Sequence, residues 1–369
     1  MNIREFGVEI WMNAHETSAR YNLAETCCDS LTVAELLDLA GQPDALDELL
    51  PLRLDYGAIE GTDRLRAAIG TLYARPQSVI TTHGAIGANA LLHAALVSAG
   101  DRVVSLVPNY QQHVSIPESL GAEVVPCPLR PENGWLPDLE ELARLATPGT
   151  RLIAFSNPNN PTGALMDEAM LREIAAIARR AGAWVLSDEV YRGIDQRDPG
   201  TTAAMADLYE KGISVGSLSK AFSLAGLRTG WIAGPEAVIR AVSVHRDYTT
   251  ISVGRIDEYL AALALEAQEA ILARNRALTR RNLAILSDWI AGEPRLSWVR
   301  PEAGTTAFPR LDAAMASAEF CERLQTETGV MFTPGSALDM EGHLRIGFAC
   351  GTDVLRGGLA RTSGFLAAL

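Results

Sequence analysis

Residues 217–231 read SLSKAFSLAGLRTGW and continue directly from a predicted strand at 213–217. A lysine at a strand end, set between serine residues and followed by glycine and arginine, is unusual for a side chain that only packs. Taken alone, Lys220 could still be a surface lysine in a polar loop. The segments that surround it in the predicted fold bear on this choice.

Two further polar clusters also follow predicted strands. Residues 156–163 read SNPNNPTG after a strand at 151–155, and residues 187–192 read SDEVYR at the end of a strand at 183–187. The carboxyl ends of parallel strands lie at one edge of a sheet, where such folds bind their ligands. We therefore expect the three clusters to converge on one crevice.

The middle of the chain alternates short apolar runs with amphipathic stretches. The apolar runs predict buried strands at 78–82, 102–107, 123–126, 151–155, 183–187 and 213–217. The amphipathic stretches predict helices at 85–98, 110–120 and 167–180, the last closed by Gly182 as a C-cap. This alternation predicts an α/β fold with a mostly parallel, mixed central sheet and helices on both faces.

After residue 254 the pattern changes to a long helical stretch through 289. Shorter strand-like pieces follow at 296–299, 305–308 and 343–347, mixed with helices at 317–328 and 353–369. We expect residues 45–254 to form the large domain and 255–369 a smaller α+β domain. Residues 1–44 form an N-terminal arm that joins the smaller domain.

Composition excludes several classes of protein. A length of 369 residues favours about two domains, and 48% hydrophobic with 21% charged residues is ordinary for a globular chain. The net charge of -13 includes no basic stripe for nucleic acid. No apolar run or leader predicts membrane insertion, the five cysteines form no C-x-x-C pair, and the six histidines show no metal-ligand spacing. We expect a cytoplasmic protein with reduced thiols and no metal.

Three motifs together resemble one family. N-P-x-N-P-T-G, D-E-V-Y and S-x-S-K-x-F-x-x-x-G-x-R-x-G-W occur here in the order and spacing of the aspartate-aminotransferase-like enzymes, the class I and II aminotransferases of fold type I. Each motif is weak singly, but the ordered set is specific, and the resemblance covers nearly the whole chain. It implies pyridoxal phosphate as cofactor, an amino acid and a 2-oxo acid as substrates, and a homodimer.

The resemblance also implies a role for each matching residue. Lys220 would hold the cofactor as a Schiff base and, once released, move the substrate proton. Asp188 would face the pyridine nitrogen, which must stay protonated, although an aspartate here could also be a turn or N-cap residue. Asn160 and Tyr191 would hold the phenolic oxygen of the ring.

A phosphate needs fixed donors and positive charge, which a strand leading into a helix N-terminus supplies. The residues that match the phosphate site of the family are Gly84, Ala85, Ile86, Ser217, Ser219 and Arg228. The family often has a hydroxyl residue where Ala85 or Ile86 stands, so one side-chain contact is in doubt while the backbone amides remain. The glycine spacing is not that of a dinucleotide site.

Three aromatic or charged residues complete the resemblance. Tyr110 matches the aromatic residue that stacks on the ring, with a core aromatic as the alternative. Tyr56 matches a tyrosine that reaches the phosphate of the neighbouring subunit. Arg345 matches the arginine that, with Asn160, binds the α-carboxylate of the substrate, the alternative being a pair with a surface carboxylate.

The N-terminal arm reads GVEIWMN over residues 7–13. In the family such arms often cover the active site or embrace the partner subunit. This makes Glu9, Trp11 and Glu16 candidates for substrate contact. For Trp11, a role in packing is an equal alternative.

The motifs leave the reaction open among three alternatives. Transamination is the default, because most members with this motif set transfer an amino group to a 2-oxo acid. Residues 130–134, 217–231 and 246–249 also resemble capreomycidine-synthase-type enzymes, which eliminate from and cyclise an arginine-like amino acid in specialised metabolism. The third alternative is a catalytically silent cofactor-binding domain of a transcription regulator, and the lack of a basic helix-turn-helix segment argues against it.

Overall fold

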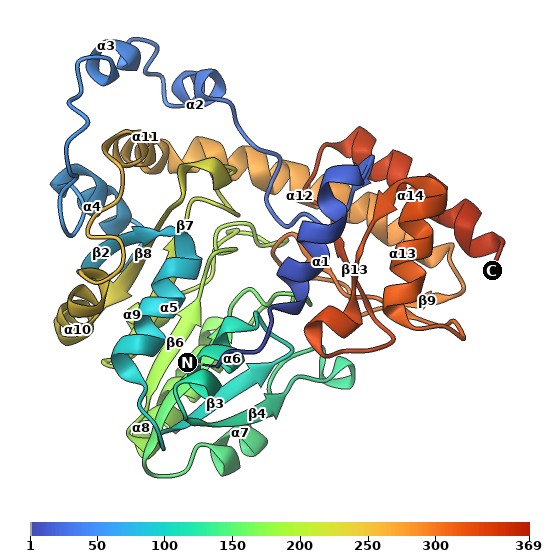
Figure 1. The fold of residues 1–369 in the computed structure, drawn as a ribbon, viewed down its shortest axis with the longest axis horizontal. Helices are drawn as coiled ribbons and strands as arrows, with labels where there is room; N and C mark the ends of the chain where they lie inside the picture. Colours follow the sequence, from blue (N-terminus) through green and yellow to red (C-terminus); the bar gives the residue numbers. More distant parts are fainter. Residues whose placement is uncertain (1) are drawn as a thin grey trace.

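The computed structural model describes residues 2–369, and its centre is a seven-stranded sheet with the order β2-β8-β7-β6-β5-β3-β4 (Figure 1). The strands are β2 (Ser78–His83), β3 (Arg102–Val107), β4 (Glu123–Pro128), β5 (Thr150–Ser156), β6 (Trp184–Asp188), β7 (Gly212–Ser217) and β8 (Thr229–Gly234). The strands β7, β6, β5, β3 and β4 pair in parallel, whereas β8 is antiparallel to both of its neighbours. The predicted mixed, mostly parallel sheet is confirmed.

Strand β8 was not predicted from the sequence. Its residues, TGWIAG, lie at the end of the lysine motif and include two glycines, which usually weaken a strand. The structure explains Gly230, because a Cβ there would lie 2.4 Å from the backbone carbonyl carbon of Gly84. The glycine allows β8 to pass close to the start of the next helix, and it does not mark a loop.

Helices cover both faces of the sheet. They are α4 (Asp63–Gly70), α5 (Gly84–Leu96), α6 (Gln112–Ser119), α7 (Leu139–Leu145), α8 (Glu168–Ala181), α9 (Met205–Leu208) and α10 (Glu236–Arg246). Helix α8 shows how local sequence sets the ends of a helix: the Asp167 side chain accepts a hydrogen bond from the amide of Met170, and Gly182 closes the helix with a φ of 77°. Leu91 and Leu92 of α5 pack on one face of the sheet with Val238 of α10.

The smaller part contains helices and short strands from both ends of the chain (Figure 1). Its helices are α1 (Gly7–His15), α13 (Ser317–Thr328) and α14 (Thr352–Ala367). Its strands are β1 (Tyr21–Asn22), β9 (Leu296–Ser297), β10 (Thr306–Ala307), β11 (Arg310–Leu311), β12 (Val330–Met331), β13 (Thr333–Pro334) and β14 (Leu344–Gly347). Because β1 pairs in parallel with β12, the N-terminal arm is built into this part.

The long helix α12 (Gln268–Ala291) connects the two parts, as Figure 1 shows. Its first turns bury Ile271 and Leu272 in the core of the large part, and its later turns bury Leu283 and Leu286 in that of the smaller part. Helix α11 (Arg255–Glu266) packs against α4, on the side of the large part. The domain boundary at residue 255 stays a prediction.

The remaining elements are short. Helices α2 (Val33–Leu39) and α3 (Ala45–Leu49) lie in the connection from the N-terminal arm to α4, and 3-10 helices span Glu16–Ser18, Pro131–Asn133, Ala225–Leu227 and Gly335–Leu338. Among residues 2–369, no helix is both long enough and apolar enough to cross a membrane.

Candidate active site

A cavity of about 330 Å³ lies at the edge of the sheet where β5, β6 and β7 end. Because β8 runs in the opposite direction, it begins at this same edge and brings Arg228 there. The predicted residues that line the cavity are Glu9, Glu16, Ala85, Ile86, Tyr110, Asn160, Asp188, Tyr191, Ser217, Ser219, Lys220, Arg228 and Arg345. The three polar clusters therefore meet in one crevice.

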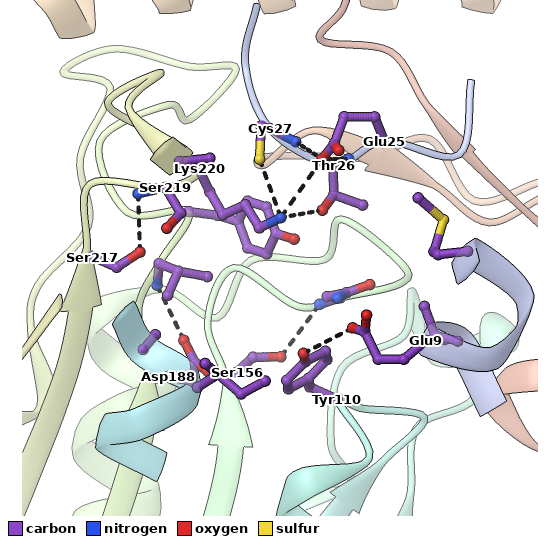
Figure 2. Close-up of a pocket in the computed structure, with 18 of the residues that line it drawn as sticks. Glu9, Glu25, Thr26, Cys27, Tyr110, Ser156, Asp188, Ser217, Ser219 and Lys220 are labelled. Carbon is purple, nitrogen blue, oxygen red and sulfur yellow. Dashed lines mark hydrogen bonds and ion pairs between the residues drawn. The ribbon is translucent and has the colours of Figure 1, made fainter. Parts of the chain in front are cut away.

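The Lys220 side chain reaches from the end of β7 to a segment of the N-terminal arm (Figure 2). Its Nζ lies 2.7 Å from Thr26 Oγ1, 3.3 Å from Cys27 Sγ and 3.7 Å from Glu25 Oε1. Burial alone would lower the pKa of this amine, but the facing thiol of Cys27, the phenol of Tyr191 and the carboxylate of Glu25 together raise it. Lys220 is therefore not a surface lysine.

The sequence analysis missed Glu25, Thr26 and Cys27. Burial opposes ionisation of Glu25, but Lys220 and the amides of Cys27 and Thr26, at 2.8 and 2.6 Å, lower its pKa to about 2. Burial raises the pKa of the Cys27 thiol to about 11. An ionised carboxylate and a neutral thiol thus flank the amine, and only the tertiary fold brings them there from almost two hundred residues away.

Asp188 ends β6 and is buried. Its Oδ2 accepts a hydrogen bond from Asn89 Nδ2 at 2.7 Å, and its Oδ1 accepts one from the amide of Val190 at 3.3 Å. His113 Nε2 lies 3.8 Å from Oδ2. The carboxylate makes a local turn contact and also lines the cavity, so the two interpretations of Asp188 are compatible. Asn89 and His113 carry no sequence signal that relates them to it.

The N-terminus of α5 forms a cradle with Arg228. Gly84 has a φ of 64°, and a Cβ there would lie 2.7 Å from Arg228 Nη2, so only glycine lets the guanidinium approach this closely. Arg228 Nη1 donates to the carbonyl oxygen of Ala225 at 2.8 Å, which fixes its position. Backbone amides, a helix N-terminus and a guanidinium together suit an anion.

Ser217 and Ser219 line the cavity beside Lys220 (Figure 2), and Arg228 lines it as well. The amide of Ser219 donates to Ser217 Oγ at 3.1 Å. Ala85 and Ile86 contribute no hydroxyl group, as the sequence indicated, and Ile86 is 42% exposed. The side-chain donors of the cradle therefore come from the lysine segment.

Arg345 lies on β14, lines the cavity and is buried. Its Nη2 donates to the carbonyl oxygen of Ala24 and to Thr333 Oγ1, both at 3.2 Å, while its Nη1 contacts Asn160 Oδ1 at 3.4 Å. Its Nε is buried without a hydrogen-bond partner among the described residues. Arg345 therefore makes no ion pair with a surface carboxylate among the described residues. The carboxylate of a ligand would give its Nε a hydrogen-bond partner.

Tyr110 and Glu9 lie side by side in the lining of the cavity (Figure 2). The phenol of Tyr110 donates to Glu9 Oε1 at 3.3 Å, and its ring contacts that of Phe6 with centroids 4.9 Å apart. Burial raises the pKa of Tyr110, so its hydroxyl stays protonated and can donate. Tyr191, buried at 3% exposure, lines the same cavity as Tyr110.

Three predicted residues do not line the cavity, namely Gly84 of the cradle, Trp11 and Tyr56. Trp11 is buried in the smaller part, where its Nε1 donates to the carbonyl oxygen of Phe332 at 2.8 Å and its ring stacks on His15. Trp11 therefore packs, and we do not retain it as a substrate contact, because its ring is turned to the core. Tyr56 is 81% exposed on the connection between α3 and α4, where it is free to meet another molecule.

Carboxylates outnumber cations among the side chains that line the cavity. The cations that line it are Lys220, Arg228 and Arg345, and the carboxylates are Glu9, Glu16, Glu25 and Asp188. Three of these carboxylates come from the N-terminal arm. Within residues 2–369, no group of histidine, cysteine, aspartate and glutamate side chains is arranged to hold a metal ion.

Comparisons with known proteins agree with this geometry. The family model described as "Aminotransferase class I and II" matches residues 40–360. Capreomycidine synthase of Streptomyces vinaceus is 34% identical over 96% of this chain and 92% of its own length. Arginine–pyruvate transaminase of Pseudomonas aeruginosa is 30% identical over 85% of this chain and 82% of its own. The crystal structure of a PLP-dependent aminotransferase from Streptococcus suis 89-1591 has a TM-score of 0.96 and 43% identity, covering 100% of this chain and 99% of that one.

Proposed function

Because the chain belongs to the class I and II aminotransferase family, we propose that it moves the amino group of an arginine-like L-amino acid to a 2-oxo acid, with pyridoxal phosphate held at Lys220. The family expected from the three motifs is confirmed. The observation that carries the substrate class is the excess of carboxylates from the N-terminal arm in the cavity.

The residues present fit pyridoxal phosphate. The cradle of Gly84 and Arg228 suits the phosphate, since a Cβ at position 84 would fill it. Lys220 is one of two lysines in the chain, and the other, Lys211, bonds to the carbonyl oxygen of Gly182 at the far end of β7. When bound, the cofactor supplies an electron sink for the bond broken at the substrate Cα.

Each remaining task falls to a residue of the chain. The amine of Lys220 would take the proton from the substrate Cα and hold it for return, with the Thr26 hydroxyl 2.7 Å away to position the amine. Asp188 would face the pyridine nitrogen of the bound cofactor. Asn160 and Tyr191 would hold its phenolic oxygen, and Tyr110 would cover its ring.

The substrate is held at both ends. Arg345 binds the α-carboxylate, because its buried Nε offers a donor without a partner. With Asp188 occupied by the cofactor, Glu9, Glu16 and Glu25 remain for the substrate side chain. A guanidinium would bind these carboxylates through charge-assisted hydrogen bonds, whereas an acidic side chain would be repelled. One of the similar proteins acts on arginine by name.

The active unit in this proposal is a homodimer. Large apolar side chains are exposed on the connection between α3 and α4, namely Leu50 at 80%, Leu54 at 78%, Tyr56 at 81% and Ile59 at 60%. A second copy of the chain would cover this group, since exposed apolar patches mark interfaces. Tyr56 would then reach the phosphate of the partner.

Cyclisation of the same kind of substrate is the second candidate, favoured by the similarity to capreomycidine synthase over 96% of the chain. One experiment separates the two. The holoenzyme is mixed separately with arginine and with β-hydroxyarginine, whose hydroxyl group can leave as water, and the cofactor absorbance is followed before and after a 2-oxo acid is added. Transamination predicts a spectral change that the oxo acid reverses, with one amino acid formed per amino acid consumed. A product formed without oxo acid would favour cyclisation. If neutral amino acids change the cofactor spectrum and arginine does not, the proposed substrate class is refuted.

A further inference from the structure

The amine of Lys220 ends on a short segment of the N-terminal arm, residues 25–27 (Figure 2). Its Nζ donates to Thr26 Oγ1 at 2.7 Å and to Cys27 Sγ at 3.3 Å, and it lies 3.7 Å from Glu25 Oε1. An ammonium group has three N–H donors, whereas a neutral amine has two and a lone pair. Three acceptor groups around one nitrogen therefore suit the ammonium form.

The arm holds these acceptors in fixed positions. The hydroxyl of Thr305, which precedes β10, donates to the carbonyl oxygen of Thr26 at 2.7 Å. Glu25 Oε1 accepts from the amides of Thr26 and Cys27 at 2.6 and 2.8 Å, so this oxygen is held towards the amine. The other oxygen of Glu25, Oε2, is left for the side chain of the substrate.

Glu25 supplies the negative charge that pairs with the amine. Among the described residues, Lys220 forms no ion pair with any other carboxylate. Arg228 and Arg345 line the same cavity, but as cations they oppose a positive charge on Nζ. The remaining titratable groups that face the amine stay neutral because burial raises their pKa values, and they are Cys27, Cys28, Tyr110 and Tyr191.

We propose that Glu25 is the counterion of the Lys220 ammonium and stabilises it on the arm once the amine has taken the proton from the substrate Cα. This rests on the proposed role of Lys220 as the base. In that step the C–H bond breaks, an N–H bond forms at Nζ, and the electron pair stays with the substrate and its cofactor. Nζ gains a positive charge, and a carboxylate already in position lowers the energy of that state.

The charge of Glu25 is available at neutral pH. Burial opposes its ionisation, but Lys220 and the amides of Cys27 and Thr26 lower its pKa to about 2. The same pairing raises the pKa of the Lys220 amine against the effect of burial. Loss of the Glu25 charge should therefore make the amine easier to deprotonate and the ammonium harder to form.

The test measures how much of the Lys220 amine is neutral. Cyanate carbamylates neutral amines but not ammonium groups, so its rate follows the neutral fraction. The full-length protein is loaded with pyridoxamine phosphate, which leaves the lysine free, and is treated with cyanate at about pH 8. Mass spectrometry of the digest gives the rate at Lys220, with Lys211, the second lysine of the chain, as internal standard.

Two variants are compared with the wild type. Glu25→Gln keeps an oxygen for the amides of the arm and removes the charge. Glu9→Gln is the matched control, because Glu9 also lines the cavity but contacts Tyr110 and forms no ion pair with Lys220. If Glu25→Gln does not fold, Glu25→Asn makes the same comparison.

We expect Lys220 to react about 5- to 30-fold faster in Glu25→Gln than in the wild type, the effect of one ion pair reduced by solvent screening. Glu9→Gln should match the wild type. Equal rates in Glu25→Gln and the wild type, or equal acceleration in both variants, would overturn the proposal.

A second measurement follows the proton itself. Single turnovers at saturating substrate are read from the cofactor spectrum with arginine and with arginine deuterated at Cα. In Glu25→Gln the rate should fall by a similar factor and keep a primary isotope effect, because proton removal is the step that loses its counterion. A fall without an isotope effect would place the loss in another step and overturn the role of Glu25 in proton transfer.

Borohydride reduction of the holoenzyme separates this proposal from the one on which it rests. If the cofactor is trapped on Lys220 while the cyanate rates do not differ, the counterion role alone falls. If the cofactor is not trapped on Lys220, both proposals fall together.

Discussion

Glu25→Gln should reduce the preference of the enzyme for a cationic substrate. Glutamine keeps an oxygen that can accept from the amides of Thr26 and Cys27, so the local loop is retained while the charge is removed. Two opposite charges about 4 Å apart interact by about 4 kcal/mol at an effective dielectric constant of about 20. The Glu25 side chain is 39% exposed, and solvent screening reduces this to about 1–2 kcal/mol.

That energy corresponds to a loss of about 5- to 30-fold in kcat/KM for arginine relative to citrulline, its uncharged counterpart. The ratio matters because Glu25 also lies 3.7 Å from Lys220, so its loss can slow both substrates alike. The assay is steady-state kinetics with each amino acid and one oxo acid. Glu5→Gln is the control, because Glu5 belongs to the same arm but does not line the cavity. An unchanged ratio of arginine to citrulline in Glu25→Gln would refute the reasoning.

Three further substitutions test other parts of the site. Gly84→Ala places a Cβ 2.7 Å from Arg228 Nη2 at a residue with a positive φ. We expect cofactor binding, measured by spectroscopic titration, to weaken at least 10-fold, because the left-handed backbone alone costs a non-glycine residue roughly that much. Gly87→Ala on the same helix is the control and should leave binding unchanged. Arg345→Lys should raise KM for arginine by about 10- to 100-fold, because lysine cannot make the two parallel hydrogen bonds to the α-carboxylate. Binding of agmatine, which lacks this carboxylate, should not change. Equal losses for both ligands would argue against the proposed role of Arg345. Burial raises the pKa of Glu189 from 4.5 to about 7, so its stabilising contribution is present below pH 4.5 and is lost as the pH rises through 7. In wild type the free energy of unfolding should therefore fall by up to about 3 kcal/mol between these pH values, and Glu189→Gln should remove this fall. Urea titrations at several pH values measure it. The same pH dependence in both proteins would contradict the raised pKa of Glu189.

Much of the large part could be predicted from the sequence, because its strands are apolar runs bounded by turn residues. Each of the six predicted strands agrees with the structure to within two residues at either end. Strand β8 was missed because Gly230 serves a close approach to Gly84, which no local pattern reveals.

The site residues also fall into those that the sequence could place and those that it could not. Residues such as Asp188 and Lys220 follow strands, so the fold class alone places them at one edge. Glu25 and Cys27 reach the amine only because the N-terminal arm pairs with β12 and crosses the cavity, a tertiary event without a local signal. Trp11 could have faced either way from α1, and the structure buries its ring in the smaller part.

The most direct test of the account is to identify the lysine that carries the cofactor. The holoenzyme is reduced with borohydride, digested, and the pyridoxyl group is located by mass spectrometry. The chain has two lysines, so the answer is binary. The account predicts that the label is on Lys220 and is lost in Lys220→Ala. A label on Lys211, or protein that takes up no label, would contradict it.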